Sequence, residues 1–147
     1  MKIFAIDPGP TESAFVVLEN GKVSSFGKVC NESLLEGLLM RPNEEEILVI
    51  EQIASYGMAV GVEVFETCFW SGRFAQAWSG KFDRLKRHEI KMHLCHTARA
   101  KDGNIRQALI DKLGPPGTKK SKGVTYGISG DVWSALAVAV TYAETRK

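Results

Sequence analysis

The first apolar segment of the chain, "KIFAID" at residues 2–7, ends on a carboxylate, and this ending constrains the fold more than any other feature. Four consecutive apolar residues are typical of a buried strand rather than a solvated edge. Asp7 closes the strand, and Pro8, Gly9 and Pro10 then predict a sharp turn. Because a buried carboxylate is costly unless a cation pairs with it, Asp7 requires a partner at this place.

Two further carboxylates stand at similar places. A buried strand is predicted at residues 47–50, and Glu51 ends it. Asp131 opens the segment "DVWSALAVAVTYAETR", which is apolar enough over residues 135–140 to be a helix packed on a sheet. If the two strands are neighbours, the three side chains can meet at one end of the sheet. Taken singly, they could be a turn residue, a strand-end charge and a helix N-cap.

Three carboxylates at one point predict a hard divalent cation, Mg²⁺ or Mn²⁺, because like charges so close cannot all remain ionised without one. Two such ions roughly 3.5–4 Å apart hold the attacking and leaving oxygens of a phosphodiester displacement. The pattern therefore predicts Asp7, Glu51 and Asp131 as metal ligands and catalytic residues of a phosphodiester-cleaving enzyme.

Periodicity and turn signals predict a single α/β domain over residues 1–147. Strands are expected at residues 2–8, 13–19, 22–29, 47–50 and 89–94. Helices are expected from an N-cap at Asn31 to just before Pro42, at about 62–79, within 98–114 with Gly114 as the stop, and from 131 onward. A Gly- and Lys-rich loop is expected at 115–130. Three hairpin strands followed by alternating helices and strands predict a mixed sheet with helices on its faces.

Composition fits this picture of one globular domain, since 44% of the 147 residues are apolar and 24% are charged. No apolar run approaches the length of a membrane span, and the first strand begins at once, without a signal peptide. The three cysteines are odd in number and far apart, so we expect reduced thiols in a cytoplasmic protein.

Charge is divided unevenly along the chain. Residues 1–71 hold 4 Lys and Arg against 11 Asp and Glu, whereas residues 72–147 hold 15 against 6. The basic half predicts a polyanionic partner. Its basic residues cluster before the predicted fifth strand, along the next helix and in the Gly-rich loop, where lysines suit phosphate contacts. They are Lys81, Arg84, Lys86, Arg87, Arg99, Lys101, Arg106, Lys119, Lys120 and Lys122.

The segments "FAIDPGPTESAFVVL", "LVIEQ" and "GDVWSALAVAVTYA" resemble the RuvC-type Holliday junction resolvases of the RNase H-like superfamily, particularly their compact bacteriophage-borne relatives. The resemblance runs over nearly the whole chain. It implies an RNase H-like domain, a homodimer in a bacterial or phage-infected cell, and Mg²⁺-dependent cleavage of branched DNA, above all four-way junctions. It also implies that Asp7, Glu51 and Asp131 bind the metals.

One position departs from that family. The resolvases carry a second acidic or histidine residue three positions after the first on the final helix, and here that position is Ser134. Ser134 could hold a metal-bound water or simply pack, and Asp102 is another candidate for the missing ligand. The family also has an aromatic in the loop after the glutamate, a place that Tyr56 takes here, further along the chain. Stacking of Tyr56 on an unpaired base is one interpretation, and a core-edge tyrosine is the other.

Other functions are compatible with parts of the sequence. A ribonuclease H, a flap nuclease or a catalytically decayed DNA-structure-binding protein would use the same scaffold. The opening segment also resembles the first phosphate motif of the actin and sugar-kinase ATPases, which need two such domains. "GPPGTKKS" fails as a P-loop because Lys119 stands where glycine is required, so no nucleotide cofactor is expected. "HLCH" at residues 93–96 lacks a second ligand pair for zinc.

The predicted helix at 62–79 carries two apolar stripes. Val62, Phe65 and Phe69 form one, and Trp70, Phe74 and Trp78 form the other. A surface helix normally has a single apolar face against its own core. The second stripe therefore predicts an interface, which agrees with the homodimer implied by the resemblance.

Overall fold

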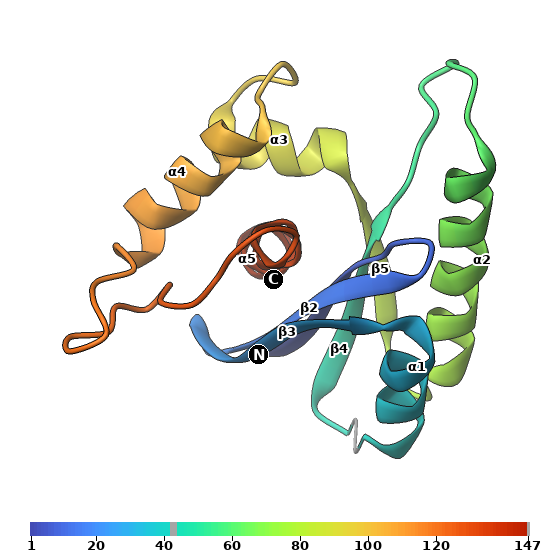
Figure 1. The fold of residues 1–147 in the computed structure, drawn as a ribbon, viewed down its shortest axis with the longest axis horizontal. Coiled ribbons are helices and arrows are strands. Elements are labelled where there is room, and N and C mark those ends of the chain that lie inside the picture. The colour runs from blue at the N-terminus through green and yellow to red at the C-terminus, as the bar shows by residue number, and fades with distance from the viewer. Residues whose placement is uncertain (42–43, 147) are drawn as a thin grey trace.

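Over residues 1–41 and 44–146, which the computed structural model describes, five strands and five helices form a single sheet with helices on both faces (Figure 1). The strands are β1 (Lys2–Asp7), β2 (Glu12–Glu19), β3 (Lys22–Cys30), β4 (Glu46–Gln52) and β5 (Phe82–Lys86). The helices are α1 (Asn31–Met40), α2 (Val62–Ala77), α3 (Arg87–Cys95), α4 (Asp102–Leu113) and α5 (Val132–Thr145).

The sheet has the order β3-β2-β1-β4-β5. Strands β1, β2 and β3 form an antiparallel meander, whereas β4 and β5 run parallel to β1 after crossovers that contain α1 and α2. The predicted mixed sheet is confirmed. The first and fourth strands are neighbours, with Ile6 opposite Ile50, so the residues that follow them lie at the same end of the sheet.

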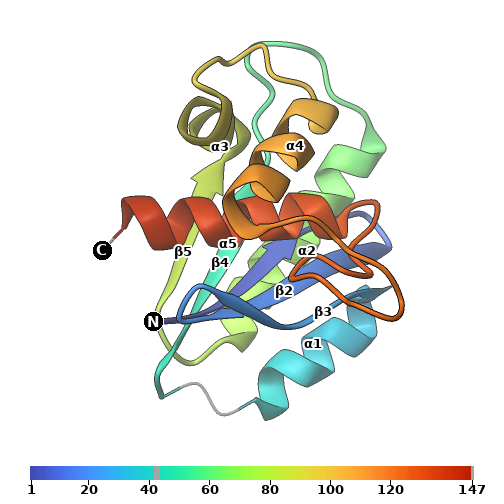
Figure 2. The same cartoon turned by 90° about the vertical axis from the view of Figure 1, so that its left-hand side faces the viewer.

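The two faces of the sheet have separate cores because successive side chains on a strand point to opposite faces. Helices α1 and α2 cover one face, over Phe4, Ile6 and Ile50. Helix α5 crosses the other face, over Ile3, Ala5 and Val49. Helices α3 and α4 pack on the side of α5 that faces away from the sheet (Figure 2). Helix α5 is thus enclosed by protein, which explains why it is apolar nearly all round.

A buried hydrogen-bond network fixes the turn between β1 and β2. The Gly9 N–H donates to Ser13 Oγ, the Ser13 hydroxyl donates to Asn31 Oδ1, and Asn31 Nδ2 donates to the Gly9 carbonyl. A Cβ at Gly9 would lie 2.3 Å from the Glu12 carbonyl oxygen, so only glycine fits. The prediction of Asn31 as an N-cap is wrong, because Asn31 is the first helical residue and its side chain ties the turn instead.

The strand predicted at 89–94 is also wrong. These residues belong to α3, and the fifth strand is the preceding segment, β5. Ile90 and Leu94 are buried four positions apart, which is a helical spacing. The Lys86 N–H donates to the Glu89 carboxylate and caps the start of the helix. In so short a segment the two patterns overlap, and tertiary packing decides between them.

Helix α2 shows the expected division of its two stripes. Trp70, Phe74 and Trp78 are buried against the sheet. Phe65 and Phe69 on the other stripe are 64% and 62% exposed, and Val62 is 74% exposed.

No helix within residues 1–41 and 44–146 is long and apolar enough to span a membrane.

Candidate acidic site at the end of the sheet

A row of residues crosses the sheet at the carboxyl end of β1. Asp7 lies opposite Ala14 on β2, and Ala14 lies opposite Lys28 on β3. Residues directly opposite each other in antiparallel strands share a face, so Asp7 and Lys28 both point toward α5. Glu51 extends the row on β4, one position beyond the Ile6–Ile50 pair. The sequence prediction that Asp7 and Glu51 meet at one end of the sheet is consistent with this register.

Glu51 is buried and Asp7 is half-buried, and the negative charges of the two carboxyls are only partly compensated. Burial, followed by the negative charges of Glu51 and Asp131, raises the pKa of Asp7 from 3.8 to about 8. The Asp7 carboxyl also shares a hydrogen bond with Glu51. Burial raises the pKa of Glu51 as well, and the Arg87 guanidinium offsets only part of that rise. The pair is therefore held in an environment that disfavours two negative charges.

Asp131 approaches the pair from α5, where it occupies the N-cap position without capping the helix through its side chain. Its charge contributes to the raised pKa of Asp7, which places it within electrostatic range of the pair. The Asp131 carboxylate is 55% exposed and accepts a hydrogen bond from Lys28 Nζ at 2.7 Å. Lys28 is thus a cationic partner that sequence reasoning missed, because 103 positions separate the two residues.

Arg87 provides the second cation at the site. It stands at the first turn of α3, with one guanidinium nitrogen 3.3 Å from Glu51 Oε1 and another bound to Asp102. Asp102 itself lies at the start of α4 with its side chain 86% exposed. Asp102 is thus linked to Glu51 through Arg87, and its negative charge contributes to the raised pKa of Glu51. The sequence identifies Arg87 only as one of several clustered basic residues, and nothing local in it indicates the contact with Glu51.

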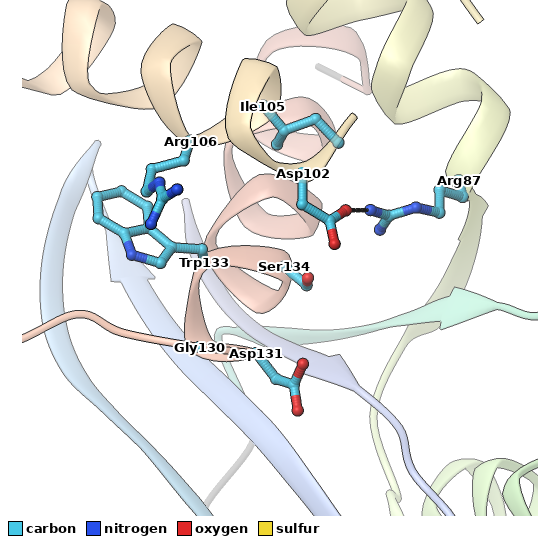
Figure 3. Close-up of a pocket in the computed structure, with 8 residues that line it drawn as sticks. All are labelled: Arg87, Asp102, Ile105, Arg106, Gly130, Asp131, Trp133 and Ser134. Atoms are coloured by element: carbon cyan, nitrogen blue, oxygen red, sulfur yellow. Dashed lines mark hydrogen bonds and ion pairs between the residues drawn. The ribbon is translucent and has the colours of Figure 1, made fainter. Parts of the chain in front are cut away.

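A cavity of 240 Å³ opens between α4 and the start of α5. Figure 3 shows Arg87 and Asp102 paired on one side of it, Arg106 beside the Trp133 ring on the other, and Asp131 and Ser134 below. Ser134 lies one helical turn after Asp131 and is half-buried. The predicted fourth position therefore faces the same hollow as Asp131, with a hydroxyl in place of a carboxylate.

The other predicted DNA-contacting residues are exposed, in the loop after β4, before and along α4, and in the loop between α4 and α5. Tyr56 is 62% exposed in the loop after β4 and has a left-handed backbone, φ 51°. Arg99, Lys101 and Arg106 are exposed before and along α4. The loop lysines Lys119, Lys120 and Lys122 are exposed as well, on a segment closed by a bridge between residues 117 and 122.

The donor set suits a hard divalent cation, because Asp7 and Glu51 offer adjacent carboxylate oxygens whose charge is poorly compensated. Within the part of the chain that the structure describes, no group of three or more His, Cys, Asp or Glu side chains is arranged to hold an ion as it stands. Asp131 turns to Lys28 instead. A three-carboxylate site would therefore need the Asp131 side chain to leave Lys28.

The fold is that of an RNase H-like domain, a mixed five-stranded sheet with helices on both faces, and among solved structures it is RuvC-like. The RuvC structure from Thermus thermophilus matches with a TM-score of 0.69 at 18% identity, over 97% of this chain and 93% of that one. T. thermophilus RuvC in complex with Holliday junction substrate matches with a TM-score of 0.63 at 16% identity and the same coverage. No protein-family model and no curated protein matches the sequence.

The raised pKa of Asp7 predicts an unusual pH dependence of stability. Because the folded state holds the Asp7 proton more tightly than the unfolded state, the stabilisation is complete below pH 3.8 and is lost as the pH rises through about 8. Asp7→Asn removes this dependence. The metal-free variant should exceed the wild type in unfolding free energy at pH 9 by at least about 1.4 kcal/mol, the equivalent of one pKa unit.

Denaturant unfolding of both proteins at pH 5, 7 and 9 measures this difference. Asp111→Asn, on the exposed side of α4, is the matched control and should follow the wild type at every pH. A wild type that gains stability relative to Asp7→Asn between pH 5 and 9 would mean that Asp7 is an ordinary ionised carboxylate paired with a cation.

Proposed function

We propose that this protein is a divalent-metal-dependent endonuclease that cuts branched DNA, with four-way junctions as its substrate. The observation that carries the proposal is the carboxyl pair of Asp7 and Glu51 on adjacent strands of a RuvC-like sheet, faced by Asp131 from α5. A neighbour with this fold is described in complex with Holliday junction substrate, which supports the choice of DNA. The basic second half of the chain supports a polyanionic substrate.

In this proposal Asp7, Glu51 and Asp131 hold Mg²⁺ or Mn²⁺, two ions per site. When bound, the metal would activate water for attack and stabilise the charge that develops on the leaving oxygen. The chain contributes position and charge. The β1–β4 pair fixes two of the carboxylates on rigid strands, and the Gly9–Ser13–Asn31 network holds the turn that follows Asp7. In-line attack would break the P–O3′ bond and leave a 5′-phosphate.

Arg87 and the surrounding basic residues complete the proposed roles. Arg87 partly compensates the negative charge of Glu51 and also pairs with Asp102. Arg99, Lys101 and Arg106, with the loop lysines Lys119, Lys120 and Lys122, would contact backbone phosphates and position the substrate without reading its sequence. The exposed Tyr56 ring is available to stack on a base that the junction leaves unpaired.

We also propose that two copies pair through the exposed stripe of α2, formed by Val62, Phe65 and Phe69. This stripe contains two exposed phenylalanines on one helix face. Aromatic side chains are favoured anchors of protein interfaces. A two-fold dimer would present two acidic sites to the two opposed strands that a junction resolvase must cut.

The first prediction from this proposal concerns cleavage. Incubation with Mg²⁺ or Mn²⁺ should cut a labelled four-way junction and leave a matched duplex intact. Asp7→Asn and Glu51→Gln should each lower the rate by more than about 100-fold, beyond the usual loss of a group that only orients a ligand. Both variants should remain folded, because each removes a poorly compensated charge. Asp111→Asn should cut as the wild type does.

The same assay separates the alternatives. Preference for an RNA–DNA hybrid would identify a ribonuclease H, and preference for a flap would identify a flap nuclease. Junction binding without cleavage under any divalent metal would indicate a DNA-structure-binding protein, with Ser134 as a lost ligand. In each case the junction-cutting proposal is wrong.

The second prediction concerns the loop lysines. Replacing Lys119, Lys120 and Lys122 by alanine should reduce the slope of log affinity against log salt by about 2.7, because three phosphate contacts no longer release counterions. Unfolding free energy should change by less than about 0.5 kcal/mol, as for other exposed positions. The control replaces Lys2, Lys22 and Lys81. The structure places these three residues at the end of the sheet opposite Asp7 and Glu51, so Lys81 is separated from the other basic residues with which the sequence grouped it. Equal slopes for the two triple variants would remove the loop from the DNA surface.

The third prediction concerns association. Sedimentation equilibrium should find a dimer at micromolar concentration. Val62→Glu with Phe65→Glu should give a folded monomer, since two charges would be buried in the interface without partners. Leu39→Glu with Met40→Glu, at the exposed end of α1, is the control and should remain a dimer. A monomeric wild type would end this part of the proposal.

A further inference from the structure

Within residues 1–41 and 44–146, Lys28 is the one basic residue that shares the row of the acidic pair across the sheet. Its neighbour in that row is Ala14, which is fully buried and has only a methyl side chain. Lys28 Nζ lies 2.7 Å from Asp131 Oδ2. Strand β3 is an edge strand, and the Lys28 side chain is 44% exposed.

Several charged groups face this corner of the site. Asp131 approaches from α5, Asp7 from β1 and Glu12 from the start of β2, and all three favour the charged form of Lys28. The hydrogen bond that Lys28 donates to Asp131 is the main cause of the raised Lys28 pKa, and Arg87 pairs with Glu51 on the other side of the site. Lys28 thus pairs with Asp131 and Arg87 compensates part of the charge of Glu51, whereas Asp7 has no ion pair within residues 1–41 and 44–146.

We propose that Lys28 is a positioning residue that holds the Asp131 carboxylate in the metal-free protein and that a divalent cation must displace to bind there. This inference rests on the proposed function, because it takes Asp131 as a metal ligand. Lys28 supplies a single positive charge on a mobile stem where the bound ion would supply two. Exchange of one for the other lets the exposed carboxylate remain paired in both states.

The exchange has a measurable consequence. If Lys28 competes with the cation, removing its charge strengthens metal binding, whereas a residue that merely supported the fold would have no such effect. An exposed ion pair of this kind has a modest energy, so Lys28→Met should lower the Kd for Mn²⁺ by about two- to fivefold. Met has a similar length and no charge, which preserves the packing of the stem.

Calorimetric titration of the DNA-free protein with Mn²⁺ measures the Kd, and thermal unfolding of each variant checks its fold. Lys28→Arg keeps the charge and should bind as the wild type does. Lys22→Met, at the start of the same strand, is the matched control and should also bind as the wild type. In the Asp131→Asn background, Lys28→Met should have no further effect, because the two residues act through one contact.

The outcomes separate this inference from the proposed function. If Asp131→Asn weakens Mn²⁺ binding but Lys28→Met leaves it unchanged or weaker, Lys28 does not compete and the inference is overturned, while the metal site stands. If Asp7→Asn and Asp131→Asn both leave Mn²⁺ binding unchanged, the metal site itself is wrong and the inference falls with it. Tighter binding in Lys28→Met that disappears in the Asp131→Asn background supports both.

Discussion

The parallel pairing of β1 with β4 is the constraint on which the rest of the site depends. It places Asp7 and Glu51 side by side at one end of the sheet, although 43 residues lie between them in the chain. The pairing is stabilised by apolar cores on both faces, so the two carboxyls cannot move apart without disturbing buried side chains. Their mutual repulsion is therefore imposed by the fold and is relieved only by protons or cations.

The surrounding charges follow from that constraint. Arg87 reaches Glu51 from the first turn of α3, and Lys28 reaches Asp131 from the edge strand β3. Each cation lies on an element at the margin of the sheet, where its stem stays partly in water and its charge remains hydrated. Asp7, at the centre of the row, lies beyond these ion pairs and has the most strongly raised pKa. The negative charge that the two cations leave uncompensated is thus concentrated at Asp7.

Much of this arrangement could be predicted from the sequence because short stretches of the chain indicate it. The apolar runs that end on Asp7 and Glu51, and the long apolar helix after Asp131, have unambiguous periodicity and fix the mixed sheet. The sequence predicts a strand where α3 lies, because a segment with few buried residues fits both the helical and the strand period. The Lys28–Asp131 and Arg87–Glu51 pairs had no local signal, since the register of β3 and the position of α3 bring them together only in the folded chain.

The pair on the strands, Asp7 and Glu51, and the exposed Asp131 differ in their effect on stability. Neutralising Asp7 relieves repulsion in a site that the fold holds rigid, so the native carboxylate is retained at a cost to the metal-free protein. Such a cost is typical of functional sites, where stability is given up for chemistry. Asp131 carries no comparable cost, because it is half exposed and already paired with Lys28. The repulsion at Asp7 is therefore fixed by the rigid strands, whereas the ion pair of Asp131 with Lys28 can be replaced by another cation. A site of this kind is rigid where the strands hold it and adjustable at the start of α5.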